Sequence, residues 1–349
     1  MAMRIPDTMR ALLLERHHDD ITQAIRSLQV VHRPVPKPGR GQVLVRIAAA
    51  PCNPSDLMFL RGHYGAFKTL PSVPGWEGAG TVVASGGGAL AAWLRGKRVA
   101  CGLQGNRDGT WAEYFVADAT SCIPLQRSMT LEQGATLIVN PLSAAGLLDT
   151  ARRGGHRAAI HTAGASQLGR MLVTMAAEWG YPLISVVRRQ AQVDLLGAVG
   201  ATDVLNSSDP DFLVQLRNAC SRLPATAAFD AVGGEFTGTL LGVMPPGSVI
   251  YVYGALAGSP CANLDPVDLI FHGKMVTGFY LGRWVQQRGA LRTLRWANRV
   301  QRMILDGRIR TTVQRRAGFD DLPEALQEYV DHMTDGKVLL LPGEVYKCS

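Results

Sequence analysis

One short segment constrains the fold of this chain more than any other: an apolar stretch that leads directly into a glycine turn and then into an amphipathic helix. Residues 158–162 read Ala-Ala-Ile-His-Thr, which is typical of a short buried strand. The turn Gly164-Ala165-Ser166-Gln167-Leu168-Gly169 follows, and apolar residues then recur at helical spacing as far as Trp179. A second strand is predicted over residues 182–187. The segment therefore predicts a βαβ unit with a right-handed crossover.

The alternation of strands and helices continues beyond this unit. Further strands are expected at residues 203–205, 228–232, 248–253 and 275–280, with a helix at residues 210–222. Such alternation predicts an α/β fold with a doubly wound parallel Rossmann sheet, which binds ligands at the carboxyl ends of its strands.

The rest of the chain has a different character. From Met9 to about Arg127, short strands between Gly and Pro turns predict a mainly β domain in which helices are nearly absent. A helix broken at Asn140-Pro141 precedes the first Rossmann strand, and a long basic helix is expected after Gln286. Strand patterns then return near the C-terminus, so we expect a discontinuous catalytic domain. The predicted domains are residues 1–128 with 285–349, and residues 129–284.

Composition excludes several classes of protein. Of 349 residues, 47% are apolar and 18% charged, which is enough for two buried cores, and no apolar run approaches the roughly 20 residues of a membrane-spanning helix. The net charge of +8 is spread along the chain, without the basic stripe typical of nucleic-acid binding. Six widely spaced cysteines and a short polar N-terminus favour a cytoplasmic protein that binds neither nucleic acid nor membrane.

The glycine turn and the strand after it predict the cofactor. Gly164 and Gly169 match two glycines of the dinucleotide fingerprint, whereas Ser166 replaces the middle one. A turn of this kind points backbone N–H groups and a helix dipole at a phosphate. The second strand ends in Val187-Arg188-Arg189, with no acid for the ribose hydroxyls of NAD, so the 2′-phosphate of NADPH is favoured. The alternatives are an ordinary strand-to-helix turn and two solvated arginines.

Motifs along nearly the whole chain identify a family resemblance. They are Asn53-Pro54-Ser55-Asp56, Gly62-His63-Tyr64, Pro74-Gly75-Trp76-Glu77-Gly78, Gly109-Thr110-Trp111, Val139-Asn140-Pro141, the glycine turn, Val187-Arg188-Arg189, Val232-Gly233-Gly234, Tyr253-Gly254 and Gly278-Phe279-Tyr280-Leu281. The chain resembles the medium-chain dehydrogenase/reductase superfamily, in its zinc-free branch of quinone oxidoreductases and 2-enoyl thioester reductases. This resemblance implies a GroES-like catalytic domain beside the Rossmann domain.

The same resemblance argues against a catalytic metal. Asn53 and Trp76 stand at the Cys and His positions of the zinc-dependent members, and a catalytic zinc needs three protein ligands. We interpret Cys52 as a small buried hydrophobe. We interpret His17-His18-Asp19-Asp20 as a solvated hairpin turn rather than a metal site.

The resemblance also implies roles for individual residues. Tyr64 would donate a hydrogen bond or a proton to the substrate, and Asn53 would point an amide into the same cleft. Asn140 would fix the nicotinamide region, and Lys337 falls on a lysine near the cofactor. The complete predicted cofactor site is Asn140, Gly164, Ser166, Gln167, Leu168, Gly169, Arg188, Arg189, Tyr253, Gly254, Ala255, Leu256, Phe279, Tyr280, Leu281 and Lys337.

The leading hypothesis is a zinc-independent NADPH-dependent enzyme that reduces a C=C bond conjugated to a carbonyl, with an enoyl thioester as substrate. An NADPH:quinone oxidoreductase, which could also take a small enone, is the close alternative. A non-catalytic NADPH-binding protein similar to the crystallin-like relatives is a second alternative, and a zinc alcohol dehydrogenase is a third. The resemblance also implies a homodimer paired through late strands of the cofactor sheet.

Overall fold

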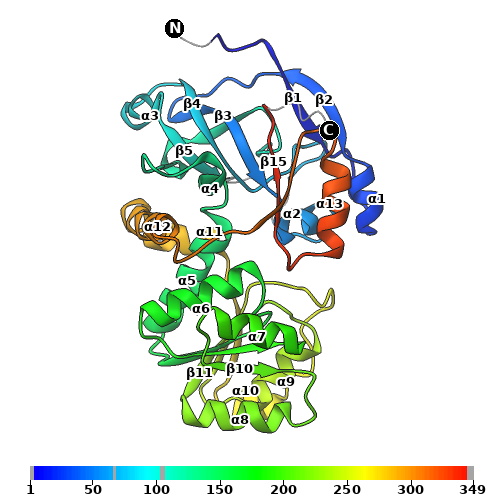
Figure 1. The fold of residues 1–349 in the computed structure, drawn as a ribbon, viewed down its shortest axis with the longest axis vertical. Helices are drawn as coiled ribbons and strands as arrows, with labels where there is room; N and C mark the ends of the chain where they lie inside the picture. The colour runs from blue at the N-terminus through cyan, green and yellow to red at the C-terminus, as the bar shows by residue number, and fades with distance from the viewer. Residues whose placement is uncertain (1–3, 66–67, 103–106, 344–349) are drawn as a thin grey trace. The chain divides into compact units, whose positions relative to one another are not determined.

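The computed structural model describes residues 4–65, 68–102 and 107–343, so Phe67 and Cys348 lie outside the described residues. The chain divides into two compact units (Figure 1). Unit 1 consists of Met1–Val139 and Ala290–Ser349, and unit 2 consists of Asn140–Gly289. No helix in the described part of the chain is long and apolar enough to cross a membrane.

Unit 2 is built on a six-stranded parallel sheet. Its strands are β8 (Ala158–His161), β9 (Leu183–Val187), β10 (Asp203–Asn206), β11 (Ala225–Asp230), β12 (Val249–Val252) and β13 (Met275–Gly278). Their order is β10-β9-β8-β11-β12-β13, and every neighbouring pair is parallel. The order reverses between β8 and β11, where ligands bind in doubly wound sheets. The predicted Rossmann sheet is confirmed.

Helices cover both faces of this sheet, with α6 and α7 on one face and α8 and α9 on the other (Figure 1). The helices of unit 2 are α5 (Val139–Arg153), α6 (Gln167–Glu178), α7 (Gln190–Ala198), α8 (Phe212–Arg222), α9 (Glu235–Val243), α10 (Pro266–Ile270) and α11 (Leu281–Arg288). Apolar residues of α8 and α9, such as Leu216 and Leu240, share a buried core with the strands. Burial on both faces explains why the central strands β8, β9 and β11 are mostly apolar.

The first helix of this group continues through Asn140-Pro141, where the sequence predicts a break. Pro141 lies in the first turn of α5. Backbone N–H groups in the first turn have no partner within the helix, so a proline there removes no helical hydrogen bond.

Unit 1 is mainly β. Its strands are β1 (Thr8–Leu13), β2 (Gln29–Pro34), β3 (Gln42–Pro51), β4 (Glu77–Ser85), β5 (Arg98–Gly102), β6 (Tyr114–Asp118), β7 (Ile123–Pro124), β14 (Val313–Ala317) and β15 (Lys337–Leu340). A seven-stranded sheet has the path β14-β15-β3-β4-β5-β7, with β6 also paired to β3, while β1 and β2 form a separate antiparallel pair. Strand β15 pairs with β3, so the chain returns from unit 2 to complete this sheet.

Helices are more frequent in the N-terminal region than the sequence predicts. The helices of unit 1 are α1 (Ile21–Arg26), α2 (Pro54–Leu60), α3 (Ala89–Leu94), the 3-10 turn η1 (Ala119–Ser121), α4 (Leu131–Ala135), α12 (Ala290–Leu305) and α13 (Leu322–Asp331). The first three are too short to show helical periodicity, and local capping helps to define them. Asp20, expected in a hairpin turn, instead caps α1 by accepting from the Gln23 backbone N–H at 2.8 Å.

Candidate active site

Asn53 lies at the centre of a buried hydrogen-bond network in unit 1. It precedes α2 and is completely buried. Its Nδ2 donates to Glu77 Oε1 at 3.0 Å, and its Oδ1 accepts from Lys337 Nζ at 2.7 Å. Glu77 Oε2 then accepts from the backbone N–H groups of Ile138 and Val139 at 3.0 and 2.9 Å. Three polar side chains from distant parts of the sequence therefore hold one another in fixed positions.

Lys337 lies on β15 and is buried within unit 1. Besides Asn53, its ammonium donates to the backbone carbonyl oxygen of Cys52 at 3.1 Å. Cys52 is also buried, as expected for a small hydrophobe, and burial raises the pKa of its thiol well above the usual value. Both hydrogen bonds of the ammonium are made to protein groups of unit 1, so a contact between Lys337 and the cofactor stays a prediction.

Asp56 connects this network to Trp76. Its Oδ2 accepts from the backbone N–H of Asn53 at 2.8 Å, and its Oδ1 accepts from the backbone N–H of Trp76 at 3.1 Å. Burial raises the pKa of Asp56 to about 7 and also raises the pKa of Glu77, whereas burial lowers the pKa of Lys337. Two buried carboxyls and one buried ammonium therefore share this region.

Tyr64 belongs to a cluster of aromatic rings and one cationic side chain that lies beside that network. Its ring centroid lies 4.7 Å from that of Trp76, and the Lys68 ammonium lies 4.5 Å from the Trp76 ring. Lys68 Nζ also lies 5.0 Å from the Phe59 ring and donates to the Val73 carbonyl oxygen at 3.0 Å. Burial lowers the pKa of Lys68 to about 8. The half-buried Tyr64 thus lies against Trp76, which the family resemblance places at a metal-ligand position of the zinc-dependent members.

The glycine turn of unit 2 leads from β8 into α6. Ser166 caps the helix by accepting from the Gly169 backbone N–H at 3.0 Å. A Cβ atom on Gly169 would lie 2.2 Å from the Gly164 carbonyl oxygen, so only glycine permits this close approach of helix and turn. Gln167 and Leu168 begin the helix, so their backbone N–H groups lie at its positive end.

Arg188 and Arg189 follow β9 directly and are both exposed. Neither guanidinium makes an ion pair or a hydrogen bond with another described residue. The backbone of Arg188 is nevertheless fixed, because its N–H donates to Gln192 Oε1 at 3.1 Å and its carbonyl accepts from Ser208 Oγ at 2.9 Å. Two cationic side chains on an ordered backbone are suited to an anionic ligand.

Asp230 organises the turn after β11, and the sequence analysis missed it. Its buried Oδ1 accepts from Thr162 Oγ1 at 2.9 Å and from the Val232 N–H at 2.8 Å. Its Oδ2 accepts from Thr237 Oγ1 at 2.7 Å and from the Gly233 N–H at 3.3 Å. The signal in the sequence is an acidic residue at the carboxyl end of an otherwise apolar strand.

The predicted cofactor loop Tyr253-Gly254-Ala255-Leu256 runs beside this turn. The Tyr253 N–H donates to the Asp230 carbonyl oxygen at 2.8 Å, and the Leu256 N–H donates to the Ala231 carbonyl oxygen at 3.1 Å. A Cβ on Gly254 would lie 2.7 Å from that Ala231 oxygen, so the loop needs glycine here. The Tyr253 hydroxyl is buried without a hydrogen-bond partner among the described residues.

The remaining predicted residues of unit 2 lie on α5, at the start of α11 or between β13 and α11. Tyr280 precedes α11 and is about half exposed, and Leu281 begins that helix. The Phe279 ring packs on α5, where a Cβ on Gly146 would lie 2.8 Å from it. Asn140 is half-buried in the first turn of α5. The structure thus holds Asn53, Tyr64 and Lys337 in unit 1 and all other predicted site residues in unit 2.

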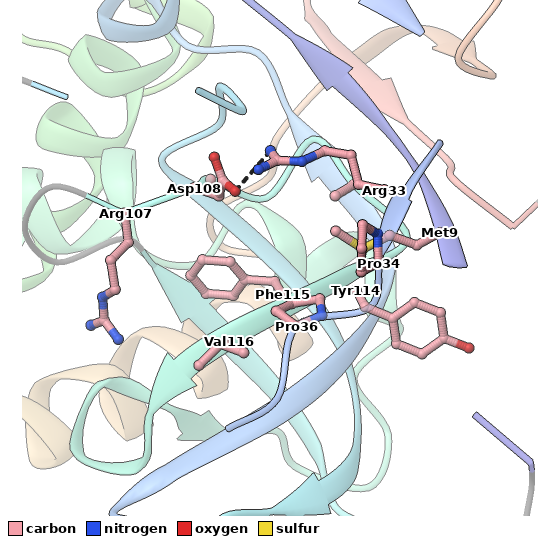
Figure 2. A pocket seen from close by; sticks show the side chains of 11 residues that line it. Met9, Arg33, Pro34, Pro36, Arg107, Asp108, Tyr114, Phe115 and Val116 are labelled. Carbon is pink, nitrogen blue, oxygen red and sulfur yellow. Dashed lines mark ion pairs between the residues drawn. The ribbon is translucent and has the colours of Figure 1, made fainter. Parts of the chain in front are cut away.

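A hollow of about 410 Å³ lies elsewhere in unit 1, and none of the predicted site residues lines it (Figure 2). Its charged side chains are already paired, since Arg33 Nη1 lies 2.8 Å from Asp108 Oδ2 and Arg107 Nη2 lies 2.5 Å from Asp118 Oδ2. Its apolar side comes from residues such as Phe115. The charged side chains that line this hollow are therefore already ion-paired, and none of them belongs to the predicted site.

Metal ligands are not gathered anywhere in the described part of the chain: no group of three or more His, Cys, Asp or Glu side chains could hold an ion there. The resemblance places Asn53 at a ligand position of the zinc-dependent members, and here the Lys337 ammonium lies 2.7 Å from Asn53 Oδ1.

Comparison with known proteins gives two family matches. Residues 39–127 match the Alcohol dehydrogenase GroES-like domain, and residues 167–296 match the family described as Zinc-binding dehydrogenase. The first match lies within unit 1, and the second lies within unit 2 apart from the start of α12.

Similar proteins include reductases of two kinds. The chain is 30% identical over 291 residues to the mitochondrial enoyl-[acyl-carrier-protein] reductase of Bos taurus, covering 80% of this chain and 74% of that protein. It is 35% identical to a putative NADPH:quinone reductase from Mesorhizobium loti, with a TM-score of 0.87 over 97% of this chain and 100% of the other. A mycobacterial protein solved with NADPH is 26% identical, with a TM-score of 0.79, 96% of this chain covered and 100% of the other. The chain therefore belongs to the medium-chain dehydrogenase/reductase superfamily, in the branch of the enoyl thioester reductases and quinone oxidoreductases.

Proposed function

We propose that the protein is an NADPH-dependent oxidoreductase that reduces a C=C bond conjugated to a carbonyl, with an enoyl thioester as its substrate. The observation that carries this proposal is the 30% identity with mitochondrial enoyl-[acyl-carrier-protein] reductases over 80% of the chain. The cofactor choice rests on the two arginines that follow β9.

The residues of unit 2 fit NADPH. The capped start of α6 suits a pyrophosphate, because its backbone N–H groups lie at the positive end of the helix. Arg188 and Arg189 suit the 2′-phosphate, since their guanidiniums have no other anionic partner among the described residues. The Tyr253 hydroxyl supplies a buried polar atom that still lacks a partner in the described chain. When bound, NADPH supplies the hydride that the substrate β-carbon accepts.

Tyr64 is assigned to the substrate. As the C=C bond takes up the hydride, negative charge develops on the carbonyl oxygen, and the Tyr64 hydroxyl donates a hydrogen bond to that oxygen. The proton that completes the reaction reaches the α-carbon from Tyr64 or from water. The tilted contact of the Tyr64 ring with Trp76, whose own ring lies 4.5 Å from the Lys68 ammonium, limits the positions available to Tyr64.

Asn53 is assigned a place in the same catalytic region without a metal. Its amide is held from both sides, by Glu77 and by Lys337. The ammonium of Lys337, 2.7 Å from Asn53 Oδ1, would repel a divalent cation at this position. We therefore propose that catalysis is independent of zinc, and activity that survives exhaustive chelation supports this proposal.

A homodimer and a cytoplasmic location complete the proposal. Strand β13 lies at the edge of the sheet and pairs only with β12 among the described strands. Exposed apolar side chains lie on it and on the adjacent α10, including Phe271 and Met275 with 76% and 54% of their surfaces accessible. Pairing of two such edges across a two-fold axis would satisfy backbone groups and cover these side chains. Mass measurement in solution tests the homodimer, and cell fractionation tests the cytoplasmic location.

The test of function is a substrate panel with NADPH consumption as the readout. Enoyl thioesters should be reduced faster than small enones and quinones. Preference for a quinone would favour the second candidate function, for which the 35% identity with the putative NADPH:quinone reductase is the supporting observation. NADPH binding without turnover of any member would favour the crystallin-like alternative. Limited proteolysis tests the predicted domain limits near residues 128 and 285.

A further inference from the structure

Helix α12 carries four arginines on one side. They are Arg292, Arg295, Arg299 and Arg302, and we call them the α12 arginine face. At 100° per residue the four side chains fall within about 80° of the helix circumference and extend about 15 Å along its axis. The spacing of three, four and three residues is therefore that of a continuous stripe.

The opposite side of α12 fixes the helix on unit 1. Thr293, Ala297 and Gln301 are buried there. Gln301 Oε1 accepts from the Gln126 backbone N–H at 2.9 Å, and its Nε2 donates to the Pro124 carbonyl oxygen at 3.3 Å. Because this side is anchored, the arginine face must point to the exterior of unit 1.

Acidic residues are missing from the sequence around this face. No Asp or Glu occurs between Asp268 and Asp306, although the chain contains 28 in all. Arg292, Arg295 and Arg302 are exposed and make no ion pair with another described residue. Arg316, an exposed arginine elsewhere in unit 1, pairs with Glu132 at 2.7 Å.

Apolar surface accompanies the charge. Leu291 lies at the N-terminal end of the face with 76% of its surface exposed, and Leu294 is 37% exposed. The Arg299 guanidinium lies 6.0 Å from the ring of Trp296. A surface that combines cations with exposed leucines suits a folded acidic partner, because phosphates alone would leave the leucines in water.

We propose that the α12 arginine face is the docking surface for an acidic acyl carrier protein that delivers the enoyl thioester. This inference rests on the proposed function, since it names the carrier of the same substrate. Complementary charge would speed the encounter and orient the carrier, whose flexible phosphopantetheine arm then presents the acyl group. Nucleic acid offers no apolar surface to the exposed leucines, whereas anionic lipid offers acyl chains, and binding to either is an outcome of the test.

The test compares three carriers of one acyl group. kcat/KM is measured with saturating NADPH for crotonyl acyl carrier protein, crotonyl-CoA and crotonyl pantetheine. The variant R292E/R295E/R302E reverses the face, and R292Q/R295Q/R302Q neutralises it in case the reversed variant does not fold. The matched control R95E/R153E/R217E changes the net charge by the same amount, at exposed arginines outside the α12 arginine face.

Charge reversal is expected to lower kcat/KM for crotonyl acyl carrier protein roughly 10- to 100-fold, mainly through KM. The values for crotonyl-CoA and crotonyl pantetheine should change less than about twofold, and so should all values of the control variant. Added salt should weaken the wild-type reaction with the protein carrier far more than the reaction with pantetheine.

Several results would overturn the inference. Unchanged kinetics with the protein carrier, while crotonyl pantetheine is still reduced, would overturn it alone. Equal losses for all three carriers would do the same, because recognition would not involve the carrier protein. Binding of duplex DNA or phosphatidylglycerol vesicles, lost on charge reversal while carrier kinetics stay normal, would give the face to another polyanion. No turnover of any crotonyl thioester would overturn the proposed function together with this inference.

Discussion

Two groups of polar and charged side chains, one in each unit, have their charge satisfied in opposite ways. In unit 1, Lys337, Asn53 and Glu77 are buried and bonded to one another at 2.7 to 3.0 Å. In unit 2, Arg188 and Arg189 are exposed and have no ionic partner in the described chain. The first arrangement is complete without any ligand, whereas the second leaves charge that an anion can satisfy.

The buried network is suited to positioning groups for a reaction, whereas the exposed arginines are suited to binding a ligand. Buried polar groups that satisfy one another keep their geometry whether or not substrate is present, which suits a region where charge develops during a reaction. Exposed cations are hydrated in the free protein and can exchange water for phosphate oxygens. We therefore expect substitutions in unit 1 to change stability and turnover, and substitutions of the unit 2 arginines to change cofactor affinity.

The largest effect is expected when the buried network loses its cation. Lys337→Met leaves Glu77 and Asn53 without their positive partner, so the free energy of unfolding should fall by about 3–5 kcal/mol. Urea unfolding measures this loss. The exposed Lys37→Met is the control and should change stability by less than about 0.5 kcal/mol. A Lys337→Met protein as stable as the wild type would show that the Lys337 ammonium does not stabilise Asn53 and Glu77 in the folded state.

Tyr64→Phe tests whether unit 1 also acts on the transition state. If the hydroxyl donates to the developing oxyanion, kcat should fall by as much as 10²- to 10³-fold, equivalent to about 2.7–4 kcal/mol, while KM changes less. Steady-state kinetics on the best substrate of the panel measure it, and NADPH affinity should stay unchanged. Tyr114→Phe, in β6, is the control for loss of a phenol hydroxyl. Turnover at the wild-type rate would remove Tyr64 from the mechanism.

In unit 2 the double variant Arg188→Ala with Arg189→Ala should weaken NADPH binding by about 2–4 kcal/mol, because two charge-assisted contacts are lost. NADH binding should change little, since NADH has no 2′-phosphate. Titration calorimetry with both cofactors provides the measurement, and Arg153→Ala with Arg217→Ala is the matched control from exposed positions of the same unit. Equal losses for the two cofactors would contradict the assignment.

The smallest effect concerns the pH dependence of stability. Burial lowers the pKa of Lys68 to about 8, below its ordinary value of 10.5, so the folded state releases this proton first. The cost of burying the ammonium is fully present below pH 8 and is relieved as pH rises toward 10.5. Relative to Lys68→Met, the wild type should therefore gain about 1–2 kcal/mol between pH 8 and pH 10.

Urea unfolding at several pH values tests this prediction for Lys68. The control is Lys97→Met, because Lys97 also lies over an indole ring, 4.4 Å from that of Trp93, but at the surface. Wild type and Lys97→Met should have parallel pH profiles. Parallel profiles for wild type and Lys68→Met would show that Lys68 keeps an ordinary pKa.

The sequence predicted the Rossmann unit well because local pattern and tertiary role agree there. Buried parallel strands are apolar runs, and Gly169 of the turn is required because a Cβ there would lie 2.2 Å from the Gly164 carbonyl oxygen. The short helices of unit 1 were missed because six or seven residues carry no helical period, and caps such as Asp20 define them instead.

The candidate site was predictable only in part. Arg188 and Arg189 were found because their place at the end of a strand follows directly from chain order. Lys68 and Asp56 were missed, since nothing in their neighbourhood marks an ionisable group that the fold will bury. Asp230 was missed for a related reason: its four partners come from three different segments.

The sequence by itself thus determined the βαβ order, the glycine turn, the pair of arginines after β9 and the arginine period of α12. Each of these features depends on residues a few positions apart in the sequence, and the regular backbone of a strand, turn or helix fixes how such residues are arranged. Only the tertiary structure decided that Lys337 bonds to Asn53, 284 positions away in the chain, and that Lys68 lies on Trp76 beside Tyr64. These contacts arise from burial, and burial depends on which distant segments pack together, which no local pattern encodes.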